Sequence, residues 1–177
     1  FTFGSPAVDV ANGKVYALTS SGLQAFNLNG TTAWTGPPAS GANYNQSAII
    51  DEGYVYFMGS GTLYKYDSAG NLQWSSPASG GQTQPTIMGG FVYVSSGALI
   101  DKFDKSTGAH ITTGGFPIST GFSQSAVAAA DGKLFSKSDV LYAYDASNGL
   151  LVWSRPDGGD STYYDSPAVS GGAVYVY

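Results

Sequence analysis

The chain repeats itself about every 40 residues, and this period limits the possible folds more than any other feature of the sequence. A small residue opens the first predicted strand of each unit, and the spacings are 41, 38, 40 and 42 residues: Ala7, Ala48, Thr86, Ala126 and Ala168. A unit of about 40 residues is the size of a four-stranded propeller blade. The period therefore predicts a β-propeller.

Each unit has the pattern of four short strands. The first strand is rich in Ala and Val, and a pair such as Asn12-Gly13 or Asp131-Gly132 separates it from an aromatic, β-branched second strand. Such pairs suit the positive φ angles of a two-residue hairpin. The third strand reads Leu-x-x-Tyr or Leu-x-x-Phe in most units and ends in Asn or Asp, three or four residues before a glycine. We expect a turn there that is capped by the Asn or Asp side chain.

A tryptophan recurs in the predicted fourth strand, four residues after the turn glycine: Trp34, Trp74 and Trp153. The third unit breaks this pattern, because Thr112 stands at the corresponding position. A large aromatic residue that recurs at one blade position predicts a wedge between neighbouring blades, with a single N–H group that needs an acceptor.

The predicted fold is all-β, a β-propeller with about four and a half blades. Four complete blades and one partial blade are expected in one domain, 1–177, at approximately 5–36, 47–76, 84–113, 125–155 and 166–177. Since four and a half blades would leave exposed strand edges, we expect the chain to be part of a larger ring of six to eight blades. The missing blades would come from a longer chain or from another copy. The alternative is a compact ring of four blades with a protruding hairpin.

Composition excludes several classes of protein. The net charge is −5, and the seven Lys and Arg residues are scattered, whereas a nucleic-acid-binding protein needs clustered basic residues. No apolar run approaches the length of a membrane span. Charged residues make up only 11 % of the chain, and Ser, Thr and Gly fill most polar positions, which suits an extracellular or periplasmic protein. The glycosylation sequons at Asn29 and Asn45 are explained by chance in so Ser- and Thr-rich a chain.

No catalytic, cofactor or metal site is predicted. Cysteine is absent, and the single histidine, His110, is expected to be a solvated or packed strand residue. The remaining candidates are carboxylates, which we interpret as solvated side chains of turns, linkers and outer blade positions: Asp51, Glu52, Asp101, Asp104, Asp157 and Asp160. A weak calcium contact at Asp157 and Asp160 is the alternative interpretation for that pair.

The linkers that lead into each first strand provide the candidate binding residues. In a propeller these linkers cross one face toward the central channel, and here amides lie beside aromatic residues in several of them: Tyr44, Asn45, Gln46, Gln84, Gln124, Tyr164 and Asp165. Ligand sites combine apolar faces with a few orienting polar groups, so this set could bind a glycan or a peptide. The structural alternative is that the amides satisfy backbone groups and that the aromatic rings pack between blades.

The repeat resembles the pyrroloquinoline-quinone-like, or tryptophan-docking, propeller repeat. The fourth unit is the nearest match, with Leu141-Tyr-Ala-Tyr-Asp145, Gly149 and Trp153. The resemblance implies the propeller fold for essentially the whole chain. The family includes quinone-dependent dehydrogenases, but it also includes a non-enzymatic outer-membrane assembly lipoprotein and repeat regions of surface proteins.

Three functions stay open at this point. The dehydrogenases of the family would be expected to have a calcium site, a tryptophan under the quinone, a catalytic aspartate and, in many, adjacent cysteines. This sequence has no cysteine, and its tryptophans all stand at docking positions. We therefore predict a non-enzymatic scaffold or binding propeller with protein or glycan partners. The alternatives are a carbohydrate-binding propeller that uses the linker residues and a fragment of a quinone-dependent dehydrogenase.

Overall fold

The computed structural model describes residues 4–19, 21–37, 46–79, 83–96, 98–121, 125–156 and 166–176, and all regular elements in these ranges are β-strands. We name five consecutive units blades A to E. Blade A comprises β1 (Ala7–Asp9), β2 (Lys14–Thr19), β3 (Gly22–Asn27) and β4 (Thr32–Thr35). Blade B comprises β5 (Ile49–Asp51), β6 (Tyr54–Gly59), β7 (Thr62–Asp67) and β8 (Leu72–Pro77). Blade C comprises β9 (Thr86–Met88), β10 (Phe91–Ser96), β11 (Leu99–Asp104), β12 (His110–Ile111) and β13 (Ile118–Ser119). Blade D comprises β14 (Ala128–Ala130), β15 (Lys133–Lys137), β16 (Val140–Asp145) and β17 (Leu151–Pro156), and the described strands of blade E are β18 (Ala168–Ser170) and β19 (Ala173–Tyr175).

Every blade is an antiparallel sheet whose strands follow one another in chain order. Blades A, B and D have four strands each, and blade C has a divided outer strand, because β12 and β13 both pair with β11. In blade E the described sheet has two strands. The predicted all-β class and four-stranded blades are confirmed.

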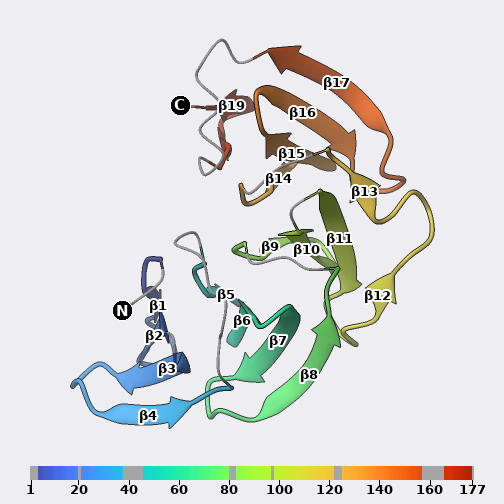
Figure 1. Ribbon diagram of the computed structural model, residues 1–177. Coiled ribbons are helices and arrows are strands. Elements are labelled where there is room, and N and C mark those ends of the chain that lie inside the picture. Colours follow the sequence, from blue (N-terminus) through green and yellow to red (C-terminus); the bar gives the residue numbers. More distant parts are fainter. Residues whose placement is uncertain are drawn as a thin grey trace.

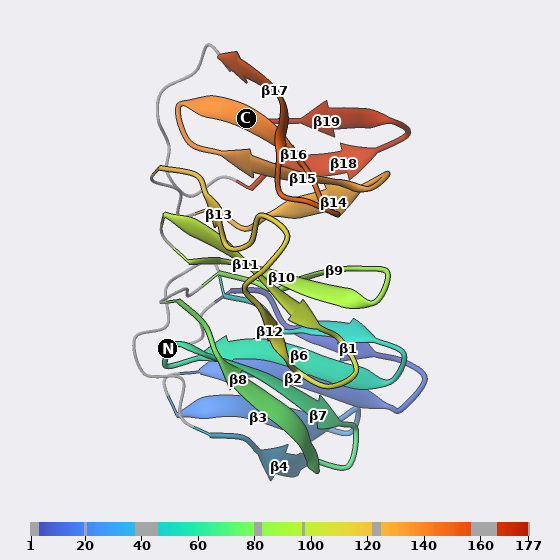
Figure 2. The same cartoon turned by 90° about the vertical axis from the view of Figure 1, so that its right-hand side faces the viewer.

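The blades are arranged as an open arc, with blade A and the β18–β19 hairpin at its two ends (Figure 1). The short inner strands point to the centre of the arc, and β1 contacts β5, β9 contacts β14, and β14 contacts β18. Seen from the side, the hairpin turns that follow the inner strands lie on one face of the arc (Figure 2). The residues that precede the inner strands lie at the opposite ends of those strands, on what we call the linker face.

The core consists of layers between blades rather than one central cluster. Between blades A and B, for example, Tyr16 and Leu23 pack with Val55 and Phe57. The same kind of layer joins B to C, C to D and D to E. Each sheet is therefore buried on the face that meets the next blade, which explains why strand two is aromatic on alternate positions.

The small residue that marks the repeat period lies before the first strand in two units. Ile49, not Ala48, pairs with the aromatic residue of strand two in blade B, and Ala128, not Ala126, does so in blade D. In all blades this partner is an aromatic residue: Tyr16, Tyr56, Tyr93, Phe135 and Tyr175. Ala48 therefore lies one residue before β5, and Ala126 lies two residues before β14. The buried aromatic ring fixes the register, since a slip of one residue would turn it outward.

The predicted hairpins are two-residue turns in four of the five blades. Glu52-Gly53 and Asp131-Gly132, for instance, both have positive φ angles, 50° and 79° in the first pair and 50° and 71° in the second. Blade A differs, because Asp9 pairs with Lys14 and leaves a four-residue loop. The Asp9 carboxylate closes that loop by accepting a hydrogen bond from the Asn12 backbone N–H at 3.0 Å.

In blades B, C and D the Asp that ends strand three caps the following turn, as predicted, whereas in blade A Asn29, not Asn27, accepts the backbone N–H of Thr31. The Asp67 Oδ1 accepts hydrogen bonds from the backbone N–H groups of Ala69 and Asn71, at 3.0 and 2.8 Å. Asp104 and Asp145 accept equivalent bonds in blades C and D. The cap holds the turn glycine at a positive φ, 91° at Gly70, where a side chain would be strained.

The tryptophans of blades A and B dock on the capped turn of the following blade. Trp34 lies against Gly70, and Trp74 lies against Gly108, so closely that a Cβ atom at either glycine would be 2.6–2.7 Å from the indole ring. Each indole N–H donates to the carbonyl one residue after the capping Asp, Trp34 to Ser68 at 3.1 Å and Trp74 to Lys105 at 3.2 Å. The predicted wedge is confirmed for these two residues.

Blade C docks on blade D without a tryptophan. Lys102 Nζ donates to the Ala146 carbonyl at 2.9 Å, at the position where the other blades place an indole N–H. Phe116, from the segment between β12 and β13, is buried, and the Lys102 ammonium lies 4.6 Å from the centre of its ring. Burial lowers the pKa of Lys102. The equivalent lysine of blade B, Lys65, donates to the Lys105 carbonyl at 3.1 Å beside the Trp74 indole, so blade C keeps the lysine contact at the interface where the tryptophan is missing.

Removing a docked indole should strongly destabilise the protein. We expect Trp74→Ala to lower the free energy of unfolding by roughly 3–5 kcal/mol, the range for deleting a buried aromatic side chain. Urea unfolding followed by circular dichroism measures this loss. Trp153→Ala is the matched control and should cost less, because no described glycine turn covers that ring. A loss below about 1 kcal/mol for Trp74→Ala would contradict the docking role.

The turn glycine should be intolerant of a side chain for two separable reasons. Gly108 and Gly132 have similar φ angles, 75° and 71°, but only Gly108 faces an indole, whereas nothing lies within 4 Å of a Cβ at Gly132. Gly132→Ala therefore reports the backbone strain alone, roughly 1–2 kcal/mol. Gly108→Ala should cost about 1–3 kcal/mol more because the ring must move. Equal losses of unfolding free energy would show that the close approach has no energetic weight.

Candidate functional site

On the linker face, equivalent side chains precede the inner strands of blades B, C and D. Gln46, Thr83 and Ser125 each lie three residues before the first residue of the inner strand. The hydroxyls of Thr83 and Ser125 donate to the carbonyls of Ser95 and Lys137, both at 2.9 Å. In blades C and D this position therefore ties the incoming chain to the end of strand two.

Gln46 departs from this pattern. Its side chain is 2 % exposed, and its Oε1 atom has no hydrogen-bond partner in the described structure. Gln84, which follows Thr83 in blade C, is half-buried. Of the candidate binding residues, the structure describes Gln46 and Gln84. The others lie outside the described residues: Tyr44, Asn45, Gln124, Tyr164 and Asp165.

Hydroxyl groups near the centre of the arc join adjacent blades. The Ser47 hydroxyl accepts the Ser5 N–H at 3.0 Å, and the Ser166 hydroxyl accepts the Ala126 N–H at 2.9 Å. The Thr86 hydroxyl donates to the Val127 carbonyl between blades C and D. We had considered that the linker amides bond to backbone groups near the first strand. In these places Ser and Thr hydroxyls form such bonds, and the serine of the recurrent Ser-Pro-Ala-Val sequence is one of them.

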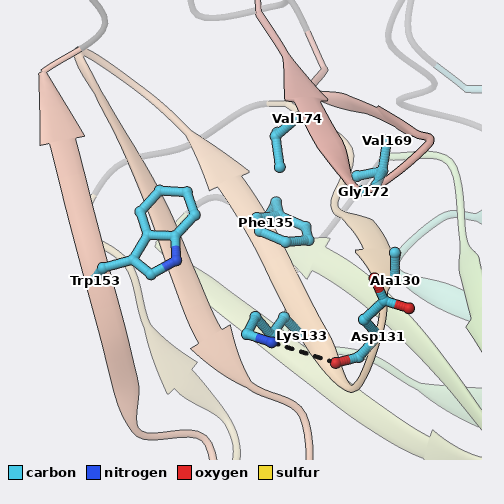
Figure 3. Close-up of a pocket in the computed structure, with 8 residues that line it drawn as sticks. All are labelled: Ala130, Asp131, Lys133, Phe135, Trp153, Val169, Gly172 and Val174. Atoms are coloured by element: carbon cyan, nitrogen blue, oxygen red, sulfur yellow. Dashed lines mark hydrogen bonds between the residues drawn. The ribbon is translucent and has the colours of Figure 1, made fainter.

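A pocket of about 180 Å³ lies between blade D and the β18–β19 hairpin. Its lining is formed by β17, β15, the β14–β15 turn and the hairpin: Ala130, Asp131, Lys133, Phe135, Trp153, Val169, Gly172 and Val174. The Trp153, Phe135 and Val174 side chains point into the same space, and Asp131 and Lys133 lie at one end of it (Figure 3). This pocket was not predicted from the sequence, because all three tryptophans stand at equivalent positions of the repeat and were expected to be packed.

His110 forms a hydrogen-bonded group with Asp101 and Ser79. The Asp101 carboxylate is fully buried and accepts the Ser79 N–H and hydroxyl, both at 2.8 Å, and its Oδ1 lies 3.1 Å from His110 Nε2. The interpretation of Asp101 as a solvated carboxylate was therefore wrong. The group is not a catalytic triad, because the serine hydroxyl donates to the carboxylate and not to the imidazole. It fastens the end of blade B to blade C.

Several other ionisable groups also have structural roles. Lys105 Nζ lies 2.8 Å from Asp51 and 3.0 Å from Glu52, which joins the turns of blades B and C and raises the pKa of Lys105. Hydrogen bonds from Ser106 and Thr107 lower the pKa of Asp104 to about 2. Burial raises the pKa of the inward tyrosines Tyr16, Tyr56 and Tyr93 to about 12.

Two further observations concern the described residues only. They contain no cluster of three or more His, Asp or Glu side chains suited to a metal ion. They also contain no helix long and apolar enough to span a membrane.

Repeated four-stranded blades, with a strand-four indole docked on the capped turn of the next blade, define a tryptophan-docking β-propeller. The family model described as outer membrane protein assembly factor BamB matches residues 19–111 and 96–177. The chain belongs to this family of pyrroloquinoline-quinone-like repeat propellers.

Solved structures show the same fold. The crystal structure of BamB from Moraxella catarrhalis superimposes with a TM-score of 0.69 at 18 % sequence identity, covering 98 % of this chain and 57 % of that one. The computationally designed Ika8 protein gives a TM-score of 0.59 at 14 % identity, covering 99 % of this chain and 67 % of that one. The chain thus spans little more than half the length of BamB. Among curated proteins, no relative matches the sequence.

The Asp101 group should contribute far more to stability than an exposed carboxylate that caps no turn. Asp101→Ala removes the buried acceptor of the Ser79 N–H and hydroxyl and the partner of His110, and we expect a loss of about 3 kcal/mol in the free energy of unfolding. Asp139→Ala is the control and should cost less, because this exposed carboxylate accepts a hydrogen bond from the neighbouring Ser138 hydroxyl. Urea unfolding at pH 7 measures both. Similar losses for the two variants would contradict the structural role of the buried carboxylate.

Proposed function

We propose that the chain is a non-enzymatic scaffold propeller that binds protein segments on its linker face. The observation that supports this most directly is the Gln46 Oε1 atom, a buried acceptor without a partner in the described structure. A buried polar atom without a hydrogen bond costs about 1–3 kcal/mol. A bound ligand that donates a hydrogen bond to Oε1 would recover this energy.

An extended peptide suits this acceptor. Its backbone presents N–H groups at regular intervals, so one of them can reach a single fixed oxygen while neighbouring side chains contact the rest of the linker face. In the other described blades the equivalent hydroxyls of Thr83 and Ser125 are already bonded to backbone, so among these three equivalent positions the unpaired acceptor is that of Gln46. The other proposed contact residues are Tyr44, Asn45, Gln84, Gln124, Tyr164 and Asp165.

An extracellular or periplasmic location accompanies this proposal. The low content of charged residues and the family's description as an outer membrane protein assembly factor both favour it. The carbohydrate-binding alternative depends on Tyr44 and Tyr164. The quinone-dependent alternative needs a tryptophan under the quinone, whereas the tryptophans of this sequence stand at docking positions. Both stay predictions.

A displayed library of linear peptides tests the proposal. Peptides selected on the intact chain should lose at least tenfold in affinity for Gln46→Leu, which keeps the size of the side chain and removes the acceptor. The same peptides should bind Gln73→Leu as tightly as the unmodified chain, because Gln73 lies on the exposed outer strand β8. Calorimetric titration measures the three affinities.

Two results would contradict the proposal. One is that no peptide is enriched on the chain, and the other is that the enriched peptides bind Gln46→Leu and the unmodified chain equally well. A glycan array with hits that Tyr164→Ala abolishes would favour the carbohydrate-binding alternative instead.

A further inference from the structure

The turn between β3 and β4 of blade A presents an asparagine whose amide nitrogen is free. Asn29 is exposed, and its Oδ1 atom accepts two hydrogen bonds from Thr31, from the backbone N–H at 3.1 Å and from the hydroxyl at 2.7 Å. In the part of the chain that the structure describes, the Nδ2 group of Asn29 donates no hydrogen bond. The oxygen of this amide is therefore held in place while its nitrogen is open to solvent.

A second asparagine fixes the orientation of this group. Asn27 Nδ2 donates to Thr31 Oγ1 at 3.0 Å, so the threonine oxygen accepts that bond and directs its own proton at Asn29 Oδ1. Since Oδ1 also accepts the Thr31 N–H, Nδ2 of Asn29 must point away from the threonine. All of these contacts lie within residues 27–31, so the turn is a local structure that does not need the rest of the blade.

The other turn asparagines of the described structure with a bonded amide nitrogen provide a contrast. Nδ2 of Asn12 donates to Asp9 at 2.8 Å, and Nδ2 of Asn71 donates to Asp67 at 2.8 Å. A group attached to either nitrogen would disturb the carboxylate contact that closes the turn. A group attached to Asn29 Nδ2 would leave both hydrogen bonds of its Oδ1 in place.

Asn29, Gly30 and Thr31 form the Asn-x-Thr triplet that accepts N-linked glycans. The second such triplet, at Asn45, has a different setting in its described part, because Gln46 is 2 % exposed and the Ser47 hydroxyl accepts the Ser5 N–H at 3.0 Å. From the sequence alone, chance explains both triplets equally well. The structure distinguishes them, since the first lies on an exposed turn and the second belongs to a packed linker.

We propose that Asn29 is an acceptor site for an N-linked glycan when the chain is exported, with a lipid-diphosphate-linked oligosaccharide as the donor. Asn29 Nδ2 attacks the anomeric carbon of the first sugar, and the new C–N bond forms as the bond from that carbon to the diphosphate oxygen breaks. The electron pair of the broken bond leaves with the lipid diphosphate, and one amide proton passes to a base of the oligosaccharyltransferase. The proposal rests on the proposed location outside the cytoplasm but not on peptide binding at Gln46.

The contacts of the turn suit this step. An amide nitrogen is a weak nucleophile, because its lone pair is delocalised toward the carbonyl oxygen. As Nδ2 loses its proton, Oδ1 gains negative charge, and the two Thr31 donors already directed at Oδ1 stabilise that charge. The neighbouring Gly30 lies in open space, since nothing is within 4 Å of a Cβ built there, which leaves room for a sugar.

Secretion of the intact chain from a host whose oligosaccharyltransferase modifies Asn-x-Thr triplets tests the proposal. Mass spectrometry of the peptides should find a glycan at Asn29 and none at Asn45, and peptide N-glycosidase should remove the glycan and convert Asn29 to aspartate. An exported chain with the unmodified mass, or with a glycan at Asn45 alone, would overturn the proposal. Gln46→Leu should be glycosylated at Asn29 as the unmodified chain is, so a failure of peptide binding leaves this test intact.

Substitutions of Thr31 test the role of its hydroxyl. Thr31→Val keeps the size of the side chain and should abolish the glycan, whereas Thr31→Ser keeps the hydroxyl and should retain it. Both variants should have the circular dichroism spectrum of the unmodified chain, because Thr31 is exposed. Glycosylation of Asn29 in the Thr31→Val chain would show that the hydroxyl does not define the site and would overturn the proposal.

The corresponding turn of blade D allows a gain-of-site control. Asn148 is exposed, its Oδ1 accepts the Leu150 N–H at 2.9 Å, and Gly149 has a φ of 71°, near the 85° of Gly30. This turn has the same Asn-Gly geometry with leucine in place of the threonine. Leu150→Thr should therefore add a second glycan, at Asn148. A Leu150→Thr chain that is modified at Asn29 alone would contradict the role assigned to the turn geometry.

Discussion

The structure depends on one interaction, the docking of each blade on the capped turn of the next. Trp34 and Trp74 bury a flat ring against a glycine and satisfy their only polar atom with a turn carbonyl. Both halves are necessary, because a buried indole without an acceptor would lose most of what its burial contributes. The Asp cap makes the docking possible, since it holds the carbonyl and the glycine in place before the neighbour arrives. This contact therefore requires the Asp and Gly of the turn, the turn conformation that they produce and the packing of the indole ring on it.

The same dependence explains why the core is divided into layers. A small antiparallel sheet has two faces and is only marginally stable alone. In this chain the faces are covered by neighbouring blades, so stability accumulates along the arc in the manner of other repeat proteins. Polar contacts such as those between Lys105 and the β5–β6 turn join the same pairs of blades from the outside. Function can therefore be located only where side chains are not already committed to a neighbouring blade.

The period, the turn chemistry and the recurrent tryptophans were sufficient to predict the fold. They did not locate the start of the first strand in two units, because the small residues at positions 48 and 126 lie just before the residues that pair with strand two. They were also insufficient for Asp101, which looks like a surface residue until the end of blade B folds over it. The packing of Phe116 beside Lys102, in the unit without a tryptophan, could not be predicted either. Phe116 lies outside the repeat pattern, in the segment between the two parts of the divided outer strand of blade C.

The candidate sites show a complementary limit. Gln46 could be singled out from its linker, but its significance comes from comparison with Thr83 and Ser125, whose hydroxyls are bonded where its Oε1 is not. A repeat makes equivalent residues easy to identify, and the repeat then serves as an internal control. In such a protein, the residue that departs from the bonding pattern of its equivalents is the strongest indication of a function beyond folding.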